Sequence, residues 1–354
     1  NLSGPGWEQT IQKVYATDNS ATATTTSTQR RRINGLGPAG LAEEIVSIDI
    51  NNNQTTAKTF IDRTTKTETR TVDEPDSTID STAVTVNGLL SSSTSKTGLT
   101  MTYAYDGLER PIGVTDPRTG LNETAYLPTG QIDYVEDAAN NRTTFTYEPT
   151  TGRKATETNA LNQVTRFAYY DRGELTNRWG DVPYPVRYVY DNYGRMTQMH
   201  TWRIDSVLWD EPTFPTGAEG NEDVTTWEYQ EAAGLLTRKT DDAGEHVDYT
   251  YTSGGRLATR TWARTPAITT TYGYDPKTAE LLTVNYSDAT PDLTFTYDRL
   301  GRQKTVADAL GSRTFVYNTD LQPLTETISG LYNKTLTRIY ATSGVIGRLS
   351  GFNT

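Results

Sequence analysis

The feature that most limits how this chain can fold is a tyrosine that recurs at an almost constant interval. The interval is 20 to 23 residues throughout, apart from a single gap of 39. The eleven positions are Tyr105, Tyr126, Tyr147, Tyr169, Tyr190, Tyr229, Tyr251, Tyr274, Tyr297, Tyr317 and Tyr340. A period of this length indicates one supersecondary unit repeated along the chain.

Most of these tyrosines end an aromatic-x-Tyr motif, which is often followed by Asp and then, four to six residues on, by Gly-Arg. The segment 142–164 shows what one unit contains. Residues 144–147 alternate in polarity with period two, which predicts a strand. A turn follows at 148–152, where Gly152 allows a positive φ angle. A second strand at 153–158 and a second turn at 159–162 complete the unit, so each repeat is predicted to be one β-hairpin.

Eleven hairpins in succession predict about twenty strands, and hence a ribbon about 100 Å long at the usual strand spacing. Only 34% of the residues are hydrophobic and the mean hydropathy is -0.64, which is too polar for two packed sheets. Open sheets rarely exceed about ten strands without curling. We therefore predict an all-β fold, a long ribbon of consecutive antiparallel hairpins that coils into a one-layer wall. The only helical turn predicted is at Gly40–Glu44.

The motif resembles that of the RHS/YD-repeat family, with the clearest copies at Tyr188–Met196 and Phe295–Gln303. The resemblance covers residues 84–354. It implies that the hairpins spiral into a hollow shell, as in the family's polymorphic toxins, toxin-complex cocoons and teneurin-like adhesion proteins. The family's core domain with its paired-Asp cleavage site and its divergent toxin tail find no counterpart here. The resemblance thus implies shell wall alone, cut from a longer polypeptide.

The chain is expected to have two parts. Residues 1–83 are rich in Thr and contain one tyrosine, Tyr15, so they are predicted to be degenerate β repeats continuous with the shell. Residues 84–354 are the repeat shell itself. The 39-residue gap after Tyr190 predicts a loop insertion at about 200–223, which contains Pro212 and Pro215.

The polar residues of the motif have structural roles available to them. A catalytic residue does not recur in every repeat, so the motif aspartates are predicted to cap turns by binding backbone N–H groups two residues on. The motif arginines are predicted to pair with these aspartates across hairpins. The aspartates are Asp106, Asp191, Asp275 and Asp298, and the arginines are Arg110, Arg153, Arg195, Arg256 and Arg302.

No residues are predicted to be catalytic, cofactor-binding or metal-binding. The chain has no cysteine and only two histidines, which disfavours zinc sites. His246 is interpreted as a solvated turn residue, with a metal or acid–base role as the less favoured reading. His200 is expected to pack at the edge of the insertion. The chain is therefore predicted not to be an enzyme and to need no cofactor, and a glycan-cleaving site is the least favoured reading.

The leading functional hypothesis is a structural wall segment of a secreted or cell-surface protein that encloses or displays a cargo domain. Its partners would be the other parts of the same polypeptide. The alternative is a carbohydrate-binding or adhesion module that stacks cell-surface glycans on exposed aromatic rings of the insertion. The candidate rings are Trp202, Trp209, Phe214 and Trp227 of the insertion, together with Trp179, which precedes Pro183 and Pro185. Buried rings would favour the wall. The net charge of -11 disfavours nucleic acid, and no apolar run is long enough for a transmembrane segment.

Overall fold

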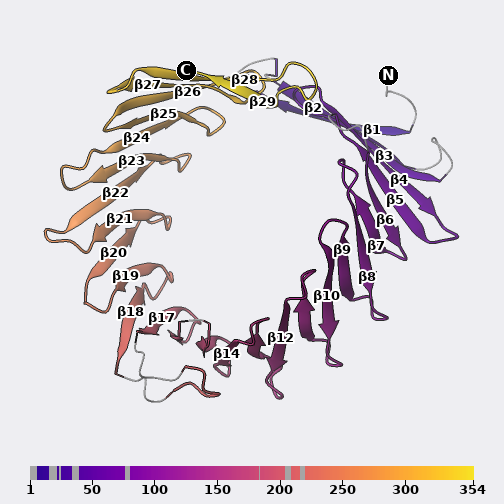
Figure 1. The fold of residues 1–354 in the computed structure, drawn as a ribbon. Coiled ribbons are helices and arrows are strands. Elements are labelled where there is room, and N and C mark those ends of the chain that lie inside the picture. Colours follow the sequence, from indigo (N-terminus) through magenta and orange to yellow (C-terminus); the bar gives the residue numbers. More distant parts are fainter. Residues whose placement is uncertain are drawn as a thin grey trace. The chain divides into compact units, whose positions relative to one another are not determined.

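The computed structural model describes residues 6–15, 22–23, 25–33, 40–75, 80–182, 184–203, 209–215 and 220–354. These residues form 29 strands joined by turns, with no helix among them (Figure 1). In particular, no helix in the described part of the chain has the length and apolarity needed to cross a membrane. The all-β hairpin ribbon predicted from the tyrosine period is confirmed.

The chain divides into two compact units. Unit 1 comprises Asn1–Leu121 and Leu293–Thr354, and unit 2 comprises Asn122–Asp292. The strands of the first segment of unit 1 are β1 (Trp7–Val14), β2 (Thr25–Ile33), β3 (Leu41–Ile48), β4 (Gln54–Asp62), β5 (Thr67–Asp73), β6 (Ser81–Val86), β7 (Leu89–Thr94), β8 (Thr100–Tyr105) and β9 (Pro111–Asp116). Those of its second segment are β24 (Leu293–Tyr297), β25 (Gln303–Asp308), β26 (Gly311–Tyr317), β27 (Pro323–Gly330), β28 (Lys334–Tyr340) and β29 (Leu349–Asn353).

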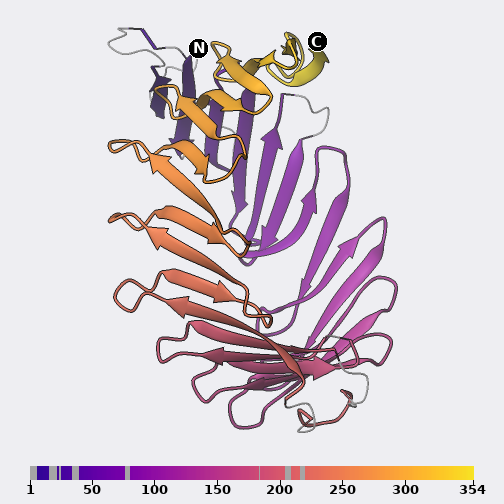
Figure 2. The same cartoon turned by 90° about the vertical axis from the view of Figure 1, so that its left-hand side faces the viewer.

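Within each of these segments, every strand pairs antiparallel with the next strand in sequence (Figure 2). The strands of residues 1–83 are therefore, like those with the tyrosine motif, consecutive and antiparallel. Strand β6 runs across residue 84 and pairs with β5 on one side and β7 on the other.

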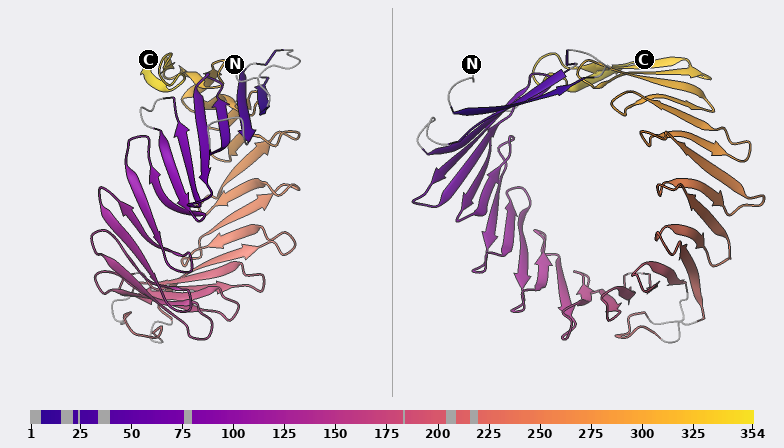
Figure 3. Two further views of the ribbon diagram at one scale, coloured as in Figure 1. Left: turned by 90° about the vertical axis from the view of Figure 1, so that its right-hand side faces the viewer. Right: turned by 180° about the vertical axis from the view of Figure 1, so that it is seen from behind.

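Unit 2 repeats the same arrangement (Figure 3). Strand β10 (Gly120–Tyr126) begins at the unit boundary and pairs with β11 (Ile132–Glu136). The remaining strands are β12 (Arg142–Tyr147), β13 (Lys154–Thr158), β14 (Val164–Tyr169), β15 (Leu175–Gly180), β16 (Val186–Tyr190), β17 (Met196–Trp202), β18 (Glu222–Tyr229), β19 (Leu236–Thr240), β20 (His246–Tyr251), β21 (Leu257–Trp262), β22 (Ile268–Tyr274) and β23 (Leu281–Tyr286). Each again pairs antiparallel with its neighbour in sequence.

All eleven motif tyrosines occupy one position in this architecture. Each ends the first strand of a hairpin, and the strand register shifts at the bond that precedes it, so every hairpin carries a β-bulge there. A bulge adds a residue to one strand and increases its local bend and twist. The repeat therefore places the same bend in every hairpin.

Few side chains are fully buried, as the low apolar content predicted. The buried apolar residues among those described are Leu41, Val46, Ala57, Trp179, Val186, Trp202 and Val284. Most strand residues are half-buried instead. Stability therefore depends on contacts between adjacent hairpins more than on a deep core.

The helical turn predicted at Gly40–Glu44 is wrong. Gly40 ends a turn with φ of 81°, and Leu41 starts strand β3. Strand β3 pairs with both β2 and β4, and Leu41 and Val46 are buried within it. Ladder hydrogen bonds on both sides of this segment outweigh the local helical preference of Leu, Ala and Glu.

Candidate functional site: the contacts between successive hairpins

The turn that follows each motif tyrosine is closed by the motif aspartate. In the clearest copy, the backbone N–H groups of Tyr193 and Arg195 donate to Asp191 Oδ1 at 2.8 and 3.0 Å. The same contacts form at Asp106 and Asp298. The predicted capping role is therefore observed, and it accounts for the regular recurrence of the aspartate.

The sequence predicts that the motif arginines pair with aspartates across hairpins. Three of them pair within their own turn instead. Arg195 Nε donates to Asp191 Oδ2 of its own turn at 2.6 Å. Arg110 and Arg302 make the same contact with Asp106 and Asp298. The turn brings residues four apart together, so each of these three arginines reaches the carboxylate of its own hairpin.

The motif tyrosines join each hairpin to the one before it. The Tyr251 hydroxyl donates to the carbonyl oxygen of Leu236, the first residue of the previous hairpin's second strand, at 2.8 Å. Six further tyrosine hydroxyls donate to the equivalent carbonyl one hairpin back. They are Tyr147, Tyr169, Tyr229, Tyr274, Tyr317 and Tyr340. Burial raises the pKa of Tyr251, so the hydroxyl remains a donor to higher pH than that of an exposed tyrosine.

The motif arginine of one hairpin also covers the tyrosine of the next. The guanidinium of Arg302 lies 3.9 Å from the ring centre of Tyr317, and that of Arg195 lies 4.9 Å from Tyr229. Arg153 and Arg256 are placed over Tyr169 and Tyr274 in the same way. A guanidinium over an aromatic face is attractive because of the ring quadrupole. One arginine thus closes its own turn and packs on the following repeat.

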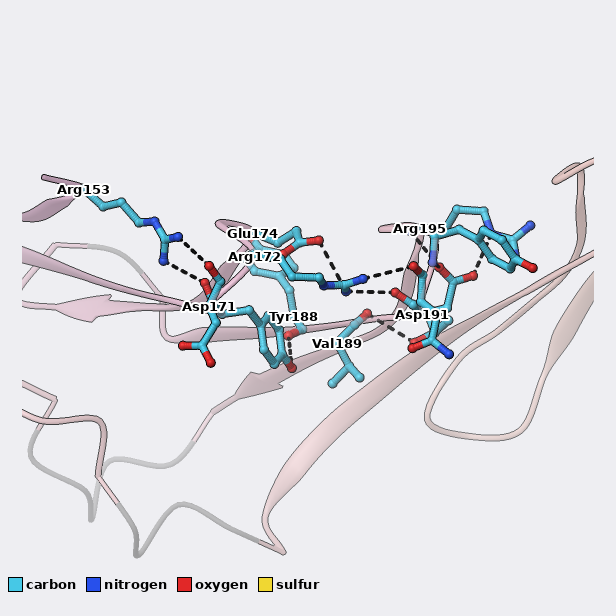
Figure 4. Close-up of polar contacts among 12 residues, drawn as sticks. Arg153, Asp171, Arg172, Glu174, Tyr188, Val189, Asp191 and Arg195 are labelled. Atoms are coloured by element: carbon cyan, nitrogen blue, oxygen red, sulfur yellow. Dashed lines mark hydrogen bonds and ion pairs between the residues drawn. The ribbon is translucent and has the colours of Figure 1, made fainter. Parts of the chain in front are cut away.

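Long polar side chains also reach from one turn to the backbone of the next. Figure 4 shows Arg153 donating to the carbonyl oxygens of Tyr170 and Asp171, both at 2.7 Å. Arg172 repeats this contact one hairpin further on, with Asp191 and Asn192, both at 3.0 Å. The planar guanidinium presents two parallel donors, which fits two adjacent carbonyls. Three other side chains each donate a single hydrogen bond to a backbone carbonyl of the next turn. These bonds run from Gln131 to Gly152, from Arg302 to Leu321 and from Gln322 to Gly347.

Removing one tyrosine hydroxyl is expected to weaken one joint between hairpins. Tyr251→Phe keeps the ring and loses the bond to Leu236, so the free energy of unfolding should fall by about 1 kcal/mol. Tyr249→Phe is the matched control, because no described residue accepts a hydrogen bond from that hydroxyl. Urea denaturation of both variants checks the difference. Equal losses in the two would contradict a specific role for the Tyr251 hydroxyl.

The turn carboxylates are expected to make the protein sensitive to acid. The Arg110 side chain and backbone N–H lower the pKa of Asp106, and those of Arg118 lower the pKa of Asp116 to about 2. A carboxyl with a lowered folded-state pKa stabilises the fold above its unfolded value of about 3.9, and this contribution is lost as pH falls through the folded value. The urea midpoint should therefore fall between about pH 4 and pH 2.

Asp106→Asn tests that assignment, because the amide oxygen can still cap the turn while the titrating charge is gone. The variant should show a shallower fall of the urea midpoint with pH than the unmodified chain. A midpoint that stays constant from pH 7 to pH 2 in the unmodified chain would contradict the prediction.

An aromatic cluster lies at the insertion in unit 2. Trp202 is 1% exposed and Trp179 is 5% exposed, and both contact Phe214 edge-on, with ring centres 5.2 and 5.6 Å apart respectively. Trp209 packs on Trp202 at 5.7 Å. The Arg187 guanidinium lies 5.0 Å from the Phe214 ring centre. The described part of the insertion, 209–215, therefore folds back on the sheet and covers its tryptophans.

Two of the rings assigned to the insertion belong to strands instead. Trp202 is the last residue of β17, and Trp227 lies within β18, where the Lys239 ammonium is 5.5 Å from its ring centre. Trp179 Nε1 donates to the carbonyl oxygen of Glu211 at 3.0 Å, which ties β15 to the insertion. Pro212, Pro215 and Phe214 lie in the described part, whereas residues 204–208 and 216–219 lie outside the described residues.

The two histidines occupy different surroundings. His200 packs beside Trp202 with nearly parallel rings, and its Nδ1 lies 3.5 Å from Glu222 Oε1. His246 is exposed at the start of β20, with Nε2 3.7 Å from Asp248. Among the described residues, no group of three or more His, Asp or Glu side chains is arranged to hold a metal ion.

No family model matches the chain, and no curated protein matches its sequence. Among solved structures, it is similar to a chain in a Tc holotoxin pore from Photorhabdus luminescens, with 15% identity and a TM-score of 0.49. It is also similar to chains in the crystal structures of TcdB2-TccC3-Cdc42 and TcdB2-TccC3-TEV, with 14% identity and TM-scores of 0.46 and 0.45. Each match covers 92% of this chain and 21% of the other, so this chain spans about a fifth of their length.

Proposed function

We propose that the chain is a wall segment of a larger YD-repeat protein that encloses or displays a cargo made elsewhere in the same polypeptide. The observation that carries this proposal is the use of the motif side chains. In the repeats described above, the tyrosine, aspartate and arginine contact groups of their own hairpin or of an adjacent one. Because these polar groups hold neighbouring hairpins together, they build an extended wall and do not form a separate site.

The same contacts support a wall that coils. Each hairpin repeats the bulge at its tyrosine, and equal bends add up along a ribbon. Sheets of this strand number curl, since a twisted open sheet does not extend indefinitely. We propose that residues 1–83 and 84–354 both contribute to this wall, with the insertion at about 200–223 as a local addition.

We further propose that the chain is not an enzyme and works outside the cell or at its surface. Enzymes concentrate titratable groups with shifted pKa values in one pocket. Here most of the lowered carboxyl pKa values belong to turn aspartates distributed along the ribbon, such as Asp62, Asp137 and Asp275. The proposed partners are the remaining parts of the same polypeptide.

The aromatic cluster favours the wall over the carbohydrate-binding alternative. Sugar rings stack on exposed aromatic faces, but Trp202 and Trp179 are covered and Trp209 and Phe214 pack against them. The cluster thus resembles a small core that anchors the insertion. A glycan array probed with the purified chain and with Trp209→Ala tests the alternative. Binding that disappears with Trp209→Ala while the fold is retained would favour the adhesion module.

Protease protection tests the wall. In the longer polypeptide, proteinase K should leave sequence beyond these 354 residues intact as long as the wall is folded. Gly311→Ala, which is expected to disrupt β26 and β27, should expose that sequence to digestion, whereas Leu108→Ala at an exposed turn should not. Digestion of the adjoining sequence at equal rates in all three proteins would overturn the proposal.

A further inference from the structure

Two turns that lie 293 residues apart in the chain contact each other within unit 1. One is the turn between β3 and β4, and the other is the loop 341–348 between β28 and β29. Asn53 Nδ2 donates to the carbonyl oxygen of Ile346 at 2.7 Å, and the Ile346 N–H donates to Asn53 Oδ1 at 2.9 Å. One side-chain amide thus satisfies both backbone groups of a residue in a distant loop, much as a neighbouring strand would. The first and last strands of the chain lie at the same end of the ribbon in Figures 1 to 3.

The two turns also fit closely at Gly347. Its φ angle is 81°, and a Cβ atom added there would come within 2.5 Å of Asn51 Nδ2. Gln322 Nε2 holds the same loop from the preceding hairpin by donating to the Gly347 carbonyl at 2.7 Å. Val345 of this loop and Asp49 of the opposite turn line a groove of about 610 Å³. The loop is therefore shaped and held for this contact.

Asp49 fixes the position of Asn53. Its Oδ1 accepts the Asn53 backbone N–H at 2.8 Å and its Oδ2 accepts Asn53 Nδ2 at 2.9 Å. The turn between β11 and β12 has the same geometry, with Asn141 bound to Asp137 through the same pairs of atoms at 2.9 and 2.8 Å. Those contacts of Asn141 stay within its own turn. This type of turn therefore forms without a distant partner, and the bond from Asn53 to Ile346 is an additional contact.

We propose that Asn53 and the 341–348 loop form a releasable clasp that joins the two segments of unit 1. Among the described strands of unit 1, extensive strand contacts join sequence neighbours, and none joins a strand of β1–β9 to one of β24–β29. The clasp consists of hydrogen bonds between two loops, in which Ile346 is exposed and Asn53 half-buried, so it opens without breaking any strand pairing. Low-stability elements of this kind open before the global fold does. The clasp is a property of the chain and does not require that the wall enclose a cargo.

Distance measurements between two spin labels test the clasp directly, because the chain has no cysteine of its own. Gln54→Cys and Ser343→Cys place labels on exposed residues on the two sides. The doubly labelled chain should give a narrow, short distance distribution. Adding Asn53→Ala should raise the ratio of open to closed molecules about tenfold, because two hydrogen bonds are lost. Adding Asn141→Ala, which breaks the same type of turn elsewhere, should leave the distribution unchanged.

Asn53→Asp provides a second and reversible test. Ionised, this side chain cannot donate to the Ile346 carbonyl and lies beside the Asp49 carboxylate, so the clasp should be open at pH 7. When protonated, it regains a donor and an acceptor, so the short distance should return as pH falls toward its pKa. Circular dichroism verifies that the strands persist in every variant. A short distance in both Asn53 variants at pH 7, or equal opening in Asn141→Ala, would overturn the proposal.

Discussion

Replacing Trp202 with alanine is expected to lower the free energy of unfolding by about 3 to 5 kcal/mol. Trp202 is the most buried tryptophan described and contacts Trp209, Phe214 and Arg187. Its removal leaves a cavity whose walls belong to β17 and to the insertion.

Urea denaturation followed by circular dichroism measures the loss. Trp227→Ala is the matched control, because that ring is half-buried and its described ring contact is with Lys239 alone. The control should lose clearly less stability than Trp202→Ala. If the two variants lost the same amount, the cluster at the insertion would be no more important than an ordinary strand residue.

The hairpin ribbon could be predicted from the sequence because its signals are local. Glycine and aspartate mark the turns within about five residues, and alternating polarity marks the strands. The tyrosine period from Tyr105 to Tyr340 therefore predicts the succession of hairpins. The capping role of Asp191 followed for the same reason. The helical turn at Gly40–Glu44 failed because strand pairing on both sides of β3 decided that segment, and such pairing involves residues 10 to 20 positions away.

The joints between hairpins could not be predicted in the same way. Which carbonyl the Tyr251 hydroxyl reaches depends on how its hairpin pairs with the preceding one, through the register of β19 and β20. Arg172 was missed because it lies outside the Gly-Arg motif, although it repeats the contact of Arg153. The only available signal was its position in a turn one repeat after Arg153. The clasp at Asn53 has no signal of spacing at all, since its partner is 293 residues away.

Gly311→Ala is expected to be among the most damaging substitutions at a glycine of this chain. Gly311 starts β26 opposite Gly330 of β27, and its φ angle is 127°, which side chains other than hydrogen rarely allow. A Cβ atom there would overlap the carbonyl oxygen of Ser329 and press on the Gly330 backbone. Because the obstruction is backbone, no side-chain rotation relieves it. The two glycines allow β26 and β27 to approach closely where Leu331 N–H donates to the Leu310 carbonyl at 2.8 Å.

The expected loss exceeds about 3 kcal/mol, since the strained conformation alone costs about 1 to 3 kcal/mol and the strands must also separate. Gly255→Ala separates the two causes. Gly255 has a φ angle of 76° but open space where its Cβ would be, so that variant should lose only about 1 kcal/mol. Hydrogen exchange of the β26 and β27 amides, measured beside urea denaturation, places the damage. If Gly311→Ala lost no more stability than Gly255→Ala and its β27 amides stayed protected, close approach of the two strands would not be the reason for glycine at this position.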